Sequence, residues 1–272
     1  MVVIITGASA GIGRALAVQL AAKGARLALA ARRLDRLEEL NRQLGGKHLV
    51  IEADVSRPED CQRLIDLTLE RFGRIDTLVC NAGYGMLCRV DQMPAEQVQR
   101  MFATNVFGTI DCIRTAMPHM LKQPIIASAG GGWRGQVMIV SSAAARRSLP
   151  FFGVYSATKA AQLSLGEAMR IELAPEKIAV TTVHPGGTES EFGDVSANLS
   201  GGQRPKRIAA EVRQTSEAVA QKMIAAIEKP KPEVWPIQAY RWGTSFGTLF
   251  PGLVDRVMLR RREQIRGGEE TG

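Results

Sequence analysis

The chain has 272 residues, a net charge of +8 and 45% hydrophobic residues. These values suit a folded body of one large domain or two small ones, and they argue against a body that is disordered throughout. No stretch approaches the roughly 18 apolar residues of a membrane-spanning helix.

The start of the chain and its cysteines bear on the cellular compartment. The run Val2–Ile5 leads directly into a glycine loop, so we expect no signal peptide. The four cysteines show no metal-type CxxC pairing. We therefore expect reduced thiols and a cytoplasmic protein.

The positive charge is compatible with nucleic acid, anionic lipid or a phosphorylated ligand. Its arginine clusters, at 32–33, 146–147 and 260–262, are dispersed and lack interleaved aromatic residues. We expect no nucleic-acid partner. The three histidines are too far apart in the sequence for ligand spacing, so we expect no metal site.

Short apolar runs alternate with longer helical patterns along the chain. The expected strands are 2–6, 26–31, 48–53, 76–80, 135–141, 178–183 and, more weakly, 233–237. The expected helices are 12–23, 33–44, 57–72, 94–121, 152–173 and 216–228. Several runs are apolar throughout, which is typical of strands buried on both faces of a parallel sheet. The order predicts one doubly wound α/β domain, with about seven parallel strands and helices on both faces.

Three segments depart from this alternation. Residues 123–134 form a Gly-rich connection, and residues 187–215 are polar and read as a lid or loop region. We place the main domain at 1–238, including this lid. Residues 239–272 then form an extension with aromatic residues, an amphipathic arginine-rich helix near 251–265 and a tail that we expect to be disordered.

The stretch TGASAGIG, residues 6–13, follows the first strand and opens the first helix. Glycines there allow a tight turn, and a helix N-terminus offers N–H groups to a pyrophosphate. The spacing is GxxxGxG, which differs from GxGxxG, so the position of the glycines carries the prediction. The expected contacts are Gly7, Ser9, Ala10, Gly11, Ile12 and Gly13.

The end of the second strand bears on the choice of cofactor. Arg32 and Arg33 follow it, where an NAD site usually carries a carboxylate and an NADP site an arginine. Asp35 reads better as a first-turn helix residue. We favour NADP(H) over NAD(H), with a solvated helix start as the alternative reading of the arginines.

Two later strand ends carry further candidate contacts. Asp54, with Val55, is placed to bind an adenine amino group, although capping of the next helix is an alternative role for Asp54. Asn81, Ala82 and Gly83 follow the fourth strand, at the edge where ligands bind in open α/β sheets.

Together these motifs resemble the short-chain dehydrogenase/reductase family. The matching set is TGASAGIG, Asp54, NAG at 81–83, Asn105, Ser142, YSATK at 155–159 and PG at 185–186. The set occurs in the family's order and covers residues 1 to about 190. The resemblance implies a Rossmann fold and an enzyme that interconverts a carbonyl and a secondary alcohol.

The resemblance also implies the roles of four side chains. Tyr155 would act as general acid or base, and Lys159, one helical turn away, would lower the pKa of Tyr155 and bind the nicotinamide ribose. Ser142 would hold the substrate oxygen. Asn105 would hold a water linked to the lysine, with a helix-surface position or a local kink as alternatives. We read His184 as structural.

The remaining expected contacts surround the chemical end. Pro185, Gly186, Thr188 and Ser190 would contact the nicotinamide carboxamide and phosphates. The expected substrate residues are Tyr84, Met86, Ser142, Leu149, Phe152 and Phe192. Because they are mostly apolar, we expect an apolar ketone, an oxoacyl chain or a steroid-like substrate. Arg146 and Arg147 leave an acidic substrate open.

Partners and competing functions complete the predictions. The resemblance also implies a homodimer or homotetramer that assembles through the helices 94–121 and 152–173. The basic C-terminal segment could cover the pocket, pair with another subunit or lie on an anionic membrane, in that order of preference. Competing functions are a non-catalytic dinucleotide-binding regulator, an NAD(H)-dependent alcohol dehydrogenase, and an epimerase or dehydratase.

Overall fold

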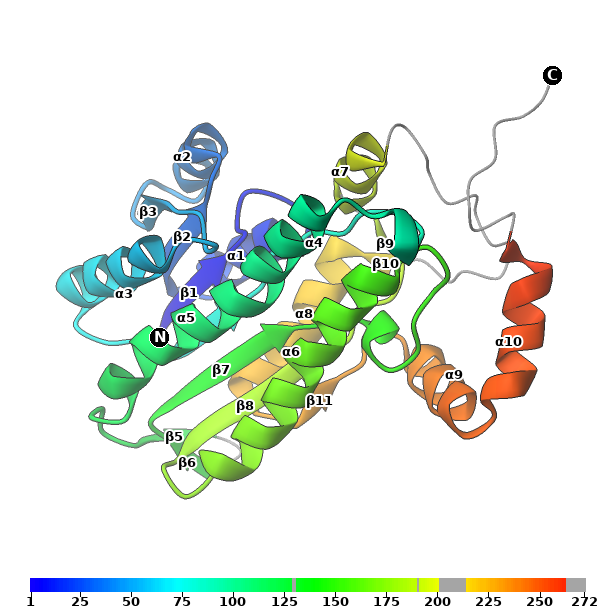
Figure 1. Cartoon of the computed structure of the whole chain (residues 1–272). Helices are drawn as coiled ribbons and strands as arrows, with labels where there is room; N and C mark the ends of the chain where they lie inside the picture. Colours follow the sequence, from blue (N-terminus) through cyan, green and yellow to red (C-terminus); the bar gives the residue numbers. More distant parts are fainter. Residues whose placement is uncertain (129–130, 190, 201–213, 263–272) are drawn as a thin grey trace.

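A seven-stranded parallel sheet forms the centre of the protein (Figure 1). The computed structural model describes residues 1–128, 131–189, 191–200 and 214–262. The strand order is β11-β8-β7-β4-β1-β2-β3. The strands are β1 (Val2–Thr6), β2 (Arg26–Ala31), β3 (Leu49–Glu52), β4 (Thr77–Cys80), β7 (Gly135–Val140), β8 (Ile178–Val183) and β11 (Glu233–Val234). The predicted doubly wound fold is confirmed.

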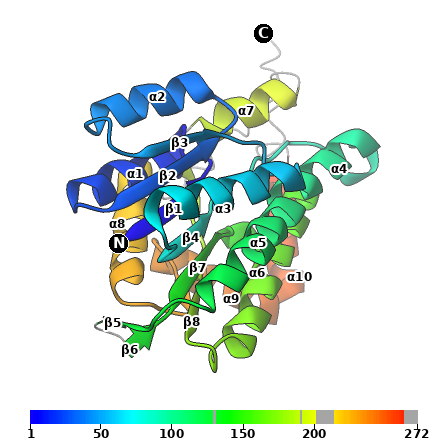
Figure 2. The ribbon, with the colours of Figure 1, turned by 90° about the vertical axis from the view of Figure 1, so that its left-hand side faces the viewer.

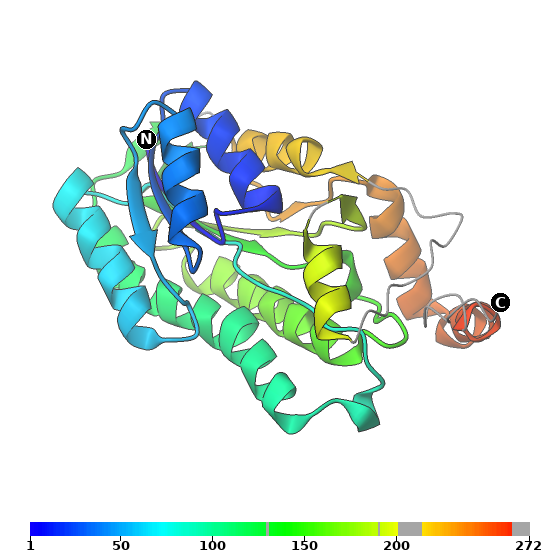
Figure 3. The ribbon, with the colours of Figure 1, turned by 90° about the horizontal axis from the view of Figure 1, so that it is seen from above.

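Helices cover both faces of this sheet (Figure 3). On one face lie α1 (Gly11–Ala22), α2 (Leu34–Gln43) and α8 (Ser216–Glu228). On the other lie α3 (Pro58–Phe72), α4 (Ala95–Phe102), α5 (Gly108–Met120) and α6 (Gly153–Glu172). The elements α7 (Phe192–Leu199), α9 (Gln238–Leu249) and α10 (Pro251–Arg260) lie at the periphery.

The apolar runs of the sequence become strands because both faces of the sheet are covered. Val3 and Ile5 of β1 belong to the core under α1, α2 and α8, while Ile4 belongs to the core on the opposite face. All five residues of β1 are buried. Every position therefore favours an apolar or small residue, and alternation is lost from the sequence.

The predicted helix 94–121 is divided by a π turn. The segment Ala103–Phe107 joins α4 to α5 and carries Asn105. Gly108 follows, and a Cβ there would lie 2.6 Å from the carbonyl oxygen of Val55. The local kink that the sequence left open is thus present, and π turns of this kind are frequent at functional sites.

The Gly-rich connection contains an antiparallel hairpin of β5 (Ile126–Ser128) and β6 (Gly131–Trp133). It lies at the end of the sheet opposite α7 (Figures 1 and 2). The expected lid contributes β9 (Thr188–Glu189), α7 and β10 (Gln214–Thr215), which pairs with β9. The rest of the lid, 201–213, lies outside the described residues.

The C-terminal extension begins with a helix that the sequence pattern did not indicate, α9, followed by α10 where an arginine-rich helix was expected. The tail from residue 263 lies outside the described residues, and the domain boundary at 238 stays a prediction. Among the described helices, none is both long and apolar enough to cross a bilayer.

Candidate active site

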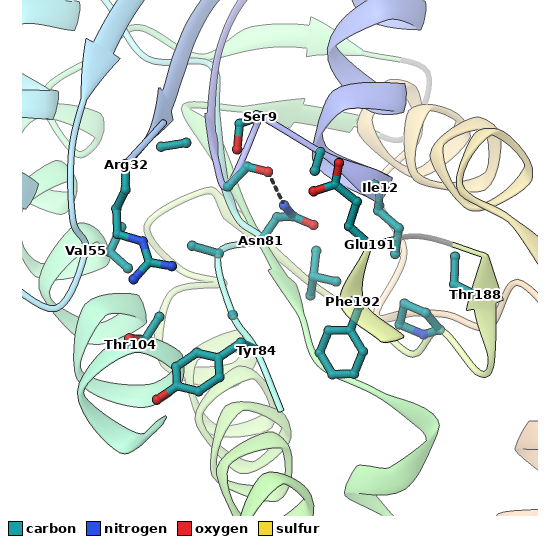
Figure 4. Close-up of a pocket in the computed structure, with 18 of the residues that line it drawn as sticks. Ser9, Ile12, Arg32, Val55, Asn81, Tyr84, Thr104, Thr188, Glu191 and Phe192 are labelled. Atoms are coloured by element: carbon teal, nitrogen blue, oxygen red, sulfur yellow. Dashed lines mark hydrogen bonds between the residues drawn. The ribbon is translucent and has the colours of Figure 1, made fainter. Parts of the chain in front are cut away.

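A cavity of about 370 Å³ opens at the carboxyl ends of the central strands (Figure 4). The strands β1 and β4 are neighbours, and the chain continues from β1 to β2 on one side and from β4 to β7 on the other. Ligands usually bind beside such a reversal of strand order, and the cavity lies there. The predicted residues on its wall are Gly7, Ser9, Ala10, Gly11, Ile12, Arg32, Arg33, Asp54, Val55, Asn81, Ala82, Gly83, Tyr84, Ser142, Tyr155, Lys159, Pro185, Gly186, Thr188 and Phe192. Segments more than 150 residues apart thus share one cavity.

Five predicted residues lie behind or beside this wall. Gly13 packs under the glycine loop, and Asn105 is fully buried. Met86 belongs to a buried apolar cluster that Tyr84 and Tyr155 pack against. Leu149 is exposed, and Phe152 contacts the Tyr155 ring edge-on at 5.9 Å between centroids.

One predicted contact cannot be placed, since Ser190 lies outside the described residues. The wall also contains Thr104 and Glu191, which the sequence analysis did not single out. Within the described residues, no group of histidine, cysteine and carboxylate side chains could hold a metal ion.

The glycine loop is shaped by close backbone contacts. Gly7 and Gly11 have φ angles of 67° and 53°, which favour glycine. A Cβ on Gly13 would lie 2.5 Å from the carbonyl oxygen of Gly7. The Asn81 side chain donates to the Thr6 carbonyl oxygen at 2.9 Å and so ties β4 to this loop. These positions require glycine for reasons of space and conformation.

The first turn of α1 is open to an anion. Ala10 precedes the helix and provides no side-chain cap, so no side chain at that position satisfies the first N–H groups. Ala10, Gly11 and Ile12 all line the cavity. A helix N-terminus of this kind is suited to a pyrophosphate, so these residues fit a dinucleotide.

Arginines beside the loop already hold one anion, the carboxylate of Glu191. Arg33 forms an ion pair with Glu191 at 2.9 Å and donates to the Ser9 hydroxyl at 3.1 Å. Arg36 pairs with the other oxygen of the same carboxylate. Hydrogen bonds from Arg33 and Arg36 lower the pKa of Glu191. Arg32 lies across the cavity, near Tyr84 (Figure 4).

Asp54 does not take the capping role that the sequence left open, since the cap position of α3 is Arg57, and its contact with adenine stays a prediction. It lines the cavity beside Val55. One of its carboxylate oxygens also accepts hydrogen bonds from the backbone N–H and the hydroxyl of Ser56, at 3.0 and 2.7 Å. The carboxylate therefore stabilises its own turn while facing the ligand space.

At the chemical end, burial sets the protonation of both key side chains. Burial raises the pKa of Tyr155 to about 12, opposed by a hydrogen bond with Ser142. Burial also lowers the pKa of Lys159 to about 7. The ammonium nitrogen lies 5.8 Å from the centre of the Tyr155 ring. Desolvation is the larger of the two effects on Tyr155, and the lowering of its pKa by Lys159 stays a prediction.

Lys159 is held by two acceptors. Its nitrogen donates to the Val140 carbonyl oxygen at 2.9 Å and to the Gln162 side chain at 2.8 Å. Gln162 in turn donates to the Asn105 carbonyl oxygen at 2.7 Å, so the π turn and the lysine are linked through one buried amide. Gln162 was missed, although its position three residues after Lys159 puts it on the same helix face.

The Asn105 side chain is fully engaged within the protein. Its oxygen accepts from the Tyr84 N–H at 3.1 Å, and its nitrogen donates to the Tyr84 carbonyl oxygen at 2.9 Å and the Thr158 hydroxyl at 3.0 Å. These bonds fasten the segment after β4 to the helix that carries Tyr155. Such a network positions the helix that carries Tyr155, and the water-binding role of Asn105 stays a prediction.

Phe192 covers Tyr155 from the lid side. The two ring centroids are 5.4 Å apart. A Cβ on Gly85 would lie 2.8 Å from the Phe192 ring and 3.0 Å from the Tyr155 ring. The glycine thus leaves room for this ring pair, and Phe192 forms part of the cavity wall beside Tyr155.

His184 lies off the cavity wall and is buried. It stacks on Trp235 with centroids 4.4 Å apart, and its Nε2 lies 3.0 Å from the Thr182 hydroxyl oxygen. Burial lowers the pKa of His184 to about 4, so the ring is neutral at pH 7. This arrangement fits a structural role.

Comparisons with known proteins point to one family. The family model described as short chain dehydrogenase matches residues 1–198. The 11-beta-hydroxysteroid dehydrogenase 1A of Arabidopsis thaliana is 42% identical over 198 residues, which cover 70% of this chain and 53% of that protein. The chain spans about half the length of this relative.

Two further relatives match most of both chains. The uncharacterized oxidoreductase Lin0452 of Listeria innocua is 31% identical over 235 residues, covering 85% of this chain and 91% of that protein. The structure of an alcohol dehydrogenase from Thermococcus sibiricus, complexed with 5-hydroxy-NADP, is 28% identical with a TM-score of 0.71. It covers 86% of this chain and 94% of its own.

Proposed function

Because the chain belongs to the short-chain dehydrogenase/reductase family and is an oxidoreductase, we propose that it interconverts a carbonyl and a secondary alcohol with NADP(H). One observation carries the proposal. The glycine loop at one end of the cavity and the pair Tyr155 and Lys159 at the other line the same space. A dinucleotide stretched between them brings its reactive ring beside a proton donor.

The residues present fit such a cofactor. The open first turn of α1 would hold the pyrophosphate, and Asp54 with Val55 would contact the adenine. Lys159 would bind the nicotinamide ribose, and Pro185, Gly186 and Thr188 the carboxamide side. When bound, NADP(H) supplies or accepts the hydride.

The protein's part of the reaction is proton transfer and positioning. With a pKa of about 12, Tyr155 is protonated at neutral pH and is ready to donate to a carbonyl oxygen during reduction. Ser142, hydrogen-bonded to Tyr155, would hold that oxygen as charge develops. Lys159, kept in place by Gln162, stabilises the phenolate that remains.

The preference for NADP(H) rests on the arginines. Arg33 and Arg36 bind a carboxylate at the place where a ribose 2′-phosphate is expected, which supports an anion site there. The Thermococcus relative is itself complexed with a modified NADP. On this account Glu191 occupies the phosphate position and leaves it when NADP(H) binds.

An apolar substrate fits the surroundings of the reacting phenol. Tyr84 and Phe192 line the cavity there, and Phe152 and Met86 pack close behind. We assign a ketone, oxoacyl or steroid-like carbonyl to this space. The Arabidopsis relative is named for a hydroxysteroid substrate, which belongs to the same chemical class.

Steady-state kinetics with a panel of carbonyl compounds tests the function and the cofactor together. The parent should reduce apolar ketones with NADPH and do so far less efficiently with NADH. Arg33→Ala should weaken NADPH binding by about 10–100-fold and leave NADH binding unchanged, since it removes one charge-assisted contact. A clear NADH preference contradicts the cofactor assignment, and activity confined to small charged substrates contradicts the apolar pocket.

We also propose a homodimer or homotetramer. Phe107, Ile110 and Ile171 are exposed on the helices where subunit contact was predicted. Sedimentation velocity should show an assembly that dissociates when these side chains are replaced by serine. A monomeric parent at micromolar concentration contradicts this proposal.

A further inference from the structure

Exposed apolar side chains are concentrated on the C-terminal arm, defined as residues 238–262. The arm contains α9 and α10 and lies at the end of the molecule opposite α2 and α3 (Figures 1 and 3). Its exposed large apolar residues are Trp242, Phe246, Leu249, Phe250, Leu253, Val257 and Leu259, with 42–74% of each residue accessible. Such a density on a short segment marks a surface that contacts something apolar.

The orientation of α9 is the reverse of an ordinary surface helix. Its side toward the protein carries Tyr240, Thr244 and Gly247. A Cβ on Gly186 would lie 2.1 Å from the Tyr240 ring, so this side is packed tightly against the cavity rim. The outer side carries Trp242, Phe246 and Leu249, spaced at i, i+4 and i+7 on one stripe.

The arm is also strongly basic. It contains five arginines, at 241, 256, 260, 261 and 262, and one acidic residue, Asp255. Asp255 forms an ion pair with Arg147 of the main domain, which anchors α10. Arg256 and Arg260 are exposed beside Leu253 and Val257 on the same helix. Aromatic and aliphatic residues beside arginines are typical of helices that lie in a lipid–water interface.

From this combination we propose that the C-terminal arm docks on the surface of an anionic lipid bilayer. The apolar stripe of α9 enters the boundary between headgroups and acyl chains, and the arginines contact the lipid phosphates. The charge favours this occupant over a second copy of the chain, since a two-fold contact through the arm would bring two sets of arginines together. The arm lies on the bilayer and does not cross it, in keeping with the described helices.

Vesicle flotation of the full chain tests this proposal. The parent should float with phosphatidylcholine vesicles that contain phosphatidylglycerol and should remain unbound with phosphatidylcholine alone. High salt should reduce the bound fraction, because the electrostatic part is screened. Replacing Trp242, Phe246 and Leu249 by serine should lower binding by at least about tenfold.

Matched variants distinguish vesicle binding through the arm from binding through other exposed charges or apolar residues. Arg256→Gln with Arg260→Gln should weaken binding to anionic vesicles by roughly tenfold, since each basic residue near the surface contributes. Ile125→Ser and Lys222→Gln, which alter an exposed apolar residue and an exposed charge elsewhere, should bind as the parent does. All variants should keep the parental circular dichroism spectrum and NADPH affinity.

Two outcomes overturn the proposal. In the first, the parent stays unbound with anionic vesicles. In the second, the triple serine variant floats as well as the parent. If sedimentation shows instead that the triple variant loses a subunit contact while vesicle binding is absent, the arm is an interface between copies.

Discussion

The phosphate end and the chemical end of the cavity are built from different groups. Backbone atoms and exposed arginines form the phosphate end, where the Arg33 side chain is 41% exposed. Buried side chains form the chemical end, where Lys159 is only 4% exposed. Exposed charges act weakly and are screened by salt, whereas buried groups have strongly shifted pKa values. Substitutions at the two ends should therefore separate binding from turnover.

Next to loss of the Tyr155 hydroxyl, the largest effect on turnover is expected for Ser142→Ala at the chemical end. Loss of the hydroxyl that would hold the substrate oxygen should lower kcat by about 10²–10³-fold. NADPH affinity, measured by fluorescence titration, should stay at the parental value. Ser148→Ala, an exposed change in the same segment, is the control. A parental kcat in Ser142→Ala contradicts the assigned role.

Lys159→Met tests burial at the same end through the pH dependence of the unfolding free energy. The folded-state pKa of about 7 is below the ordinary 10.5, so the unfolded chain binds a proton that the folded chain lacks between these values. The unfolding free energy of the parent without cofactor should therefore rise with pH over this range. Below about pH 7 the buried lysine is charged, and its burial destabilises the folded protein by the full amount. The variant should lack this rise.

Urea unfolding between about pH 7 and pH 9.5 measures the difference. This window stays below the titration of Tyr155, whose pKa is raised to about 12. Lys222→Met, an exposed lysine on α8, should keep the parental slope. A Lys159→Met variant with the same slope as the parent shows that Lys159 is charged in the folded protein.

Gly13→Ala should act on the phosphate end through packing. The new methyl group would meet the Gly7 carbonyl oxygen at 2.5 Å and displace the loop. We expect a loss of about 1–3 kcal/mol in unfolding free energy and at least roughly tenfold weaker binding of both NADPH and NADH. Gly243→Ala on α9, where a Cβ meets nothing within 4 Å, should be tolerated.

The smallest effect is expected for Glu191→Gln. Removing this carboxylate frees Arg33 and Arg36, so NADPH should bind more tightly and NADH should be unaffected. Because both ion pairs are partly exposed, the gain should be at most about fivefold. Glu189→Gln, a nearby exposed carboxylate, is the control. Unchanged NADPH affinity in Glu191→Gln refutes competition with the 2′-phosphate.

The two ends also differ in how far the sequence predicted them. The glycine loop is local, so TGASAGIG and its place after β1 were enough to position it on the cavity wall. Tyr155, Lys159 and Ser142 reached the same wall, placed by family resemblance. The sheet followed from apolar runs, because strands covered on both faces leave a direct record in the sequence.

Contacts between segments that are far apart in the chain could not be predicted from a local sequence pattern. The pairing of Arg33 with Glu191 joins residues 158 positions apart, and no local pattern indicates it. The π turn at Asn105 precedes the close contact of Gly108 with Val55, and the helical periodicity of 94–121 left a kink there only as an alternative. The sequence pattern did not indicate α9, because its inner side, which carries Tyr240, Thr244 and Gly247, lacks the apolar stripe of an ordinary surface helix.

Tyr155→Phe tests whether Tyr155 is the proton donor, when NADPH binding and carbonyl reduction are measured on the same sample. Only the hydroxyl is removed, so the ring contacts with Phe152 and Phe192 remain. We expect parental NADPH affinity and a turnover reduced by about 10²–10⁴-fold, the usual contribution of a general acid. Carbonyl reduction at the parental rate would contradict this role.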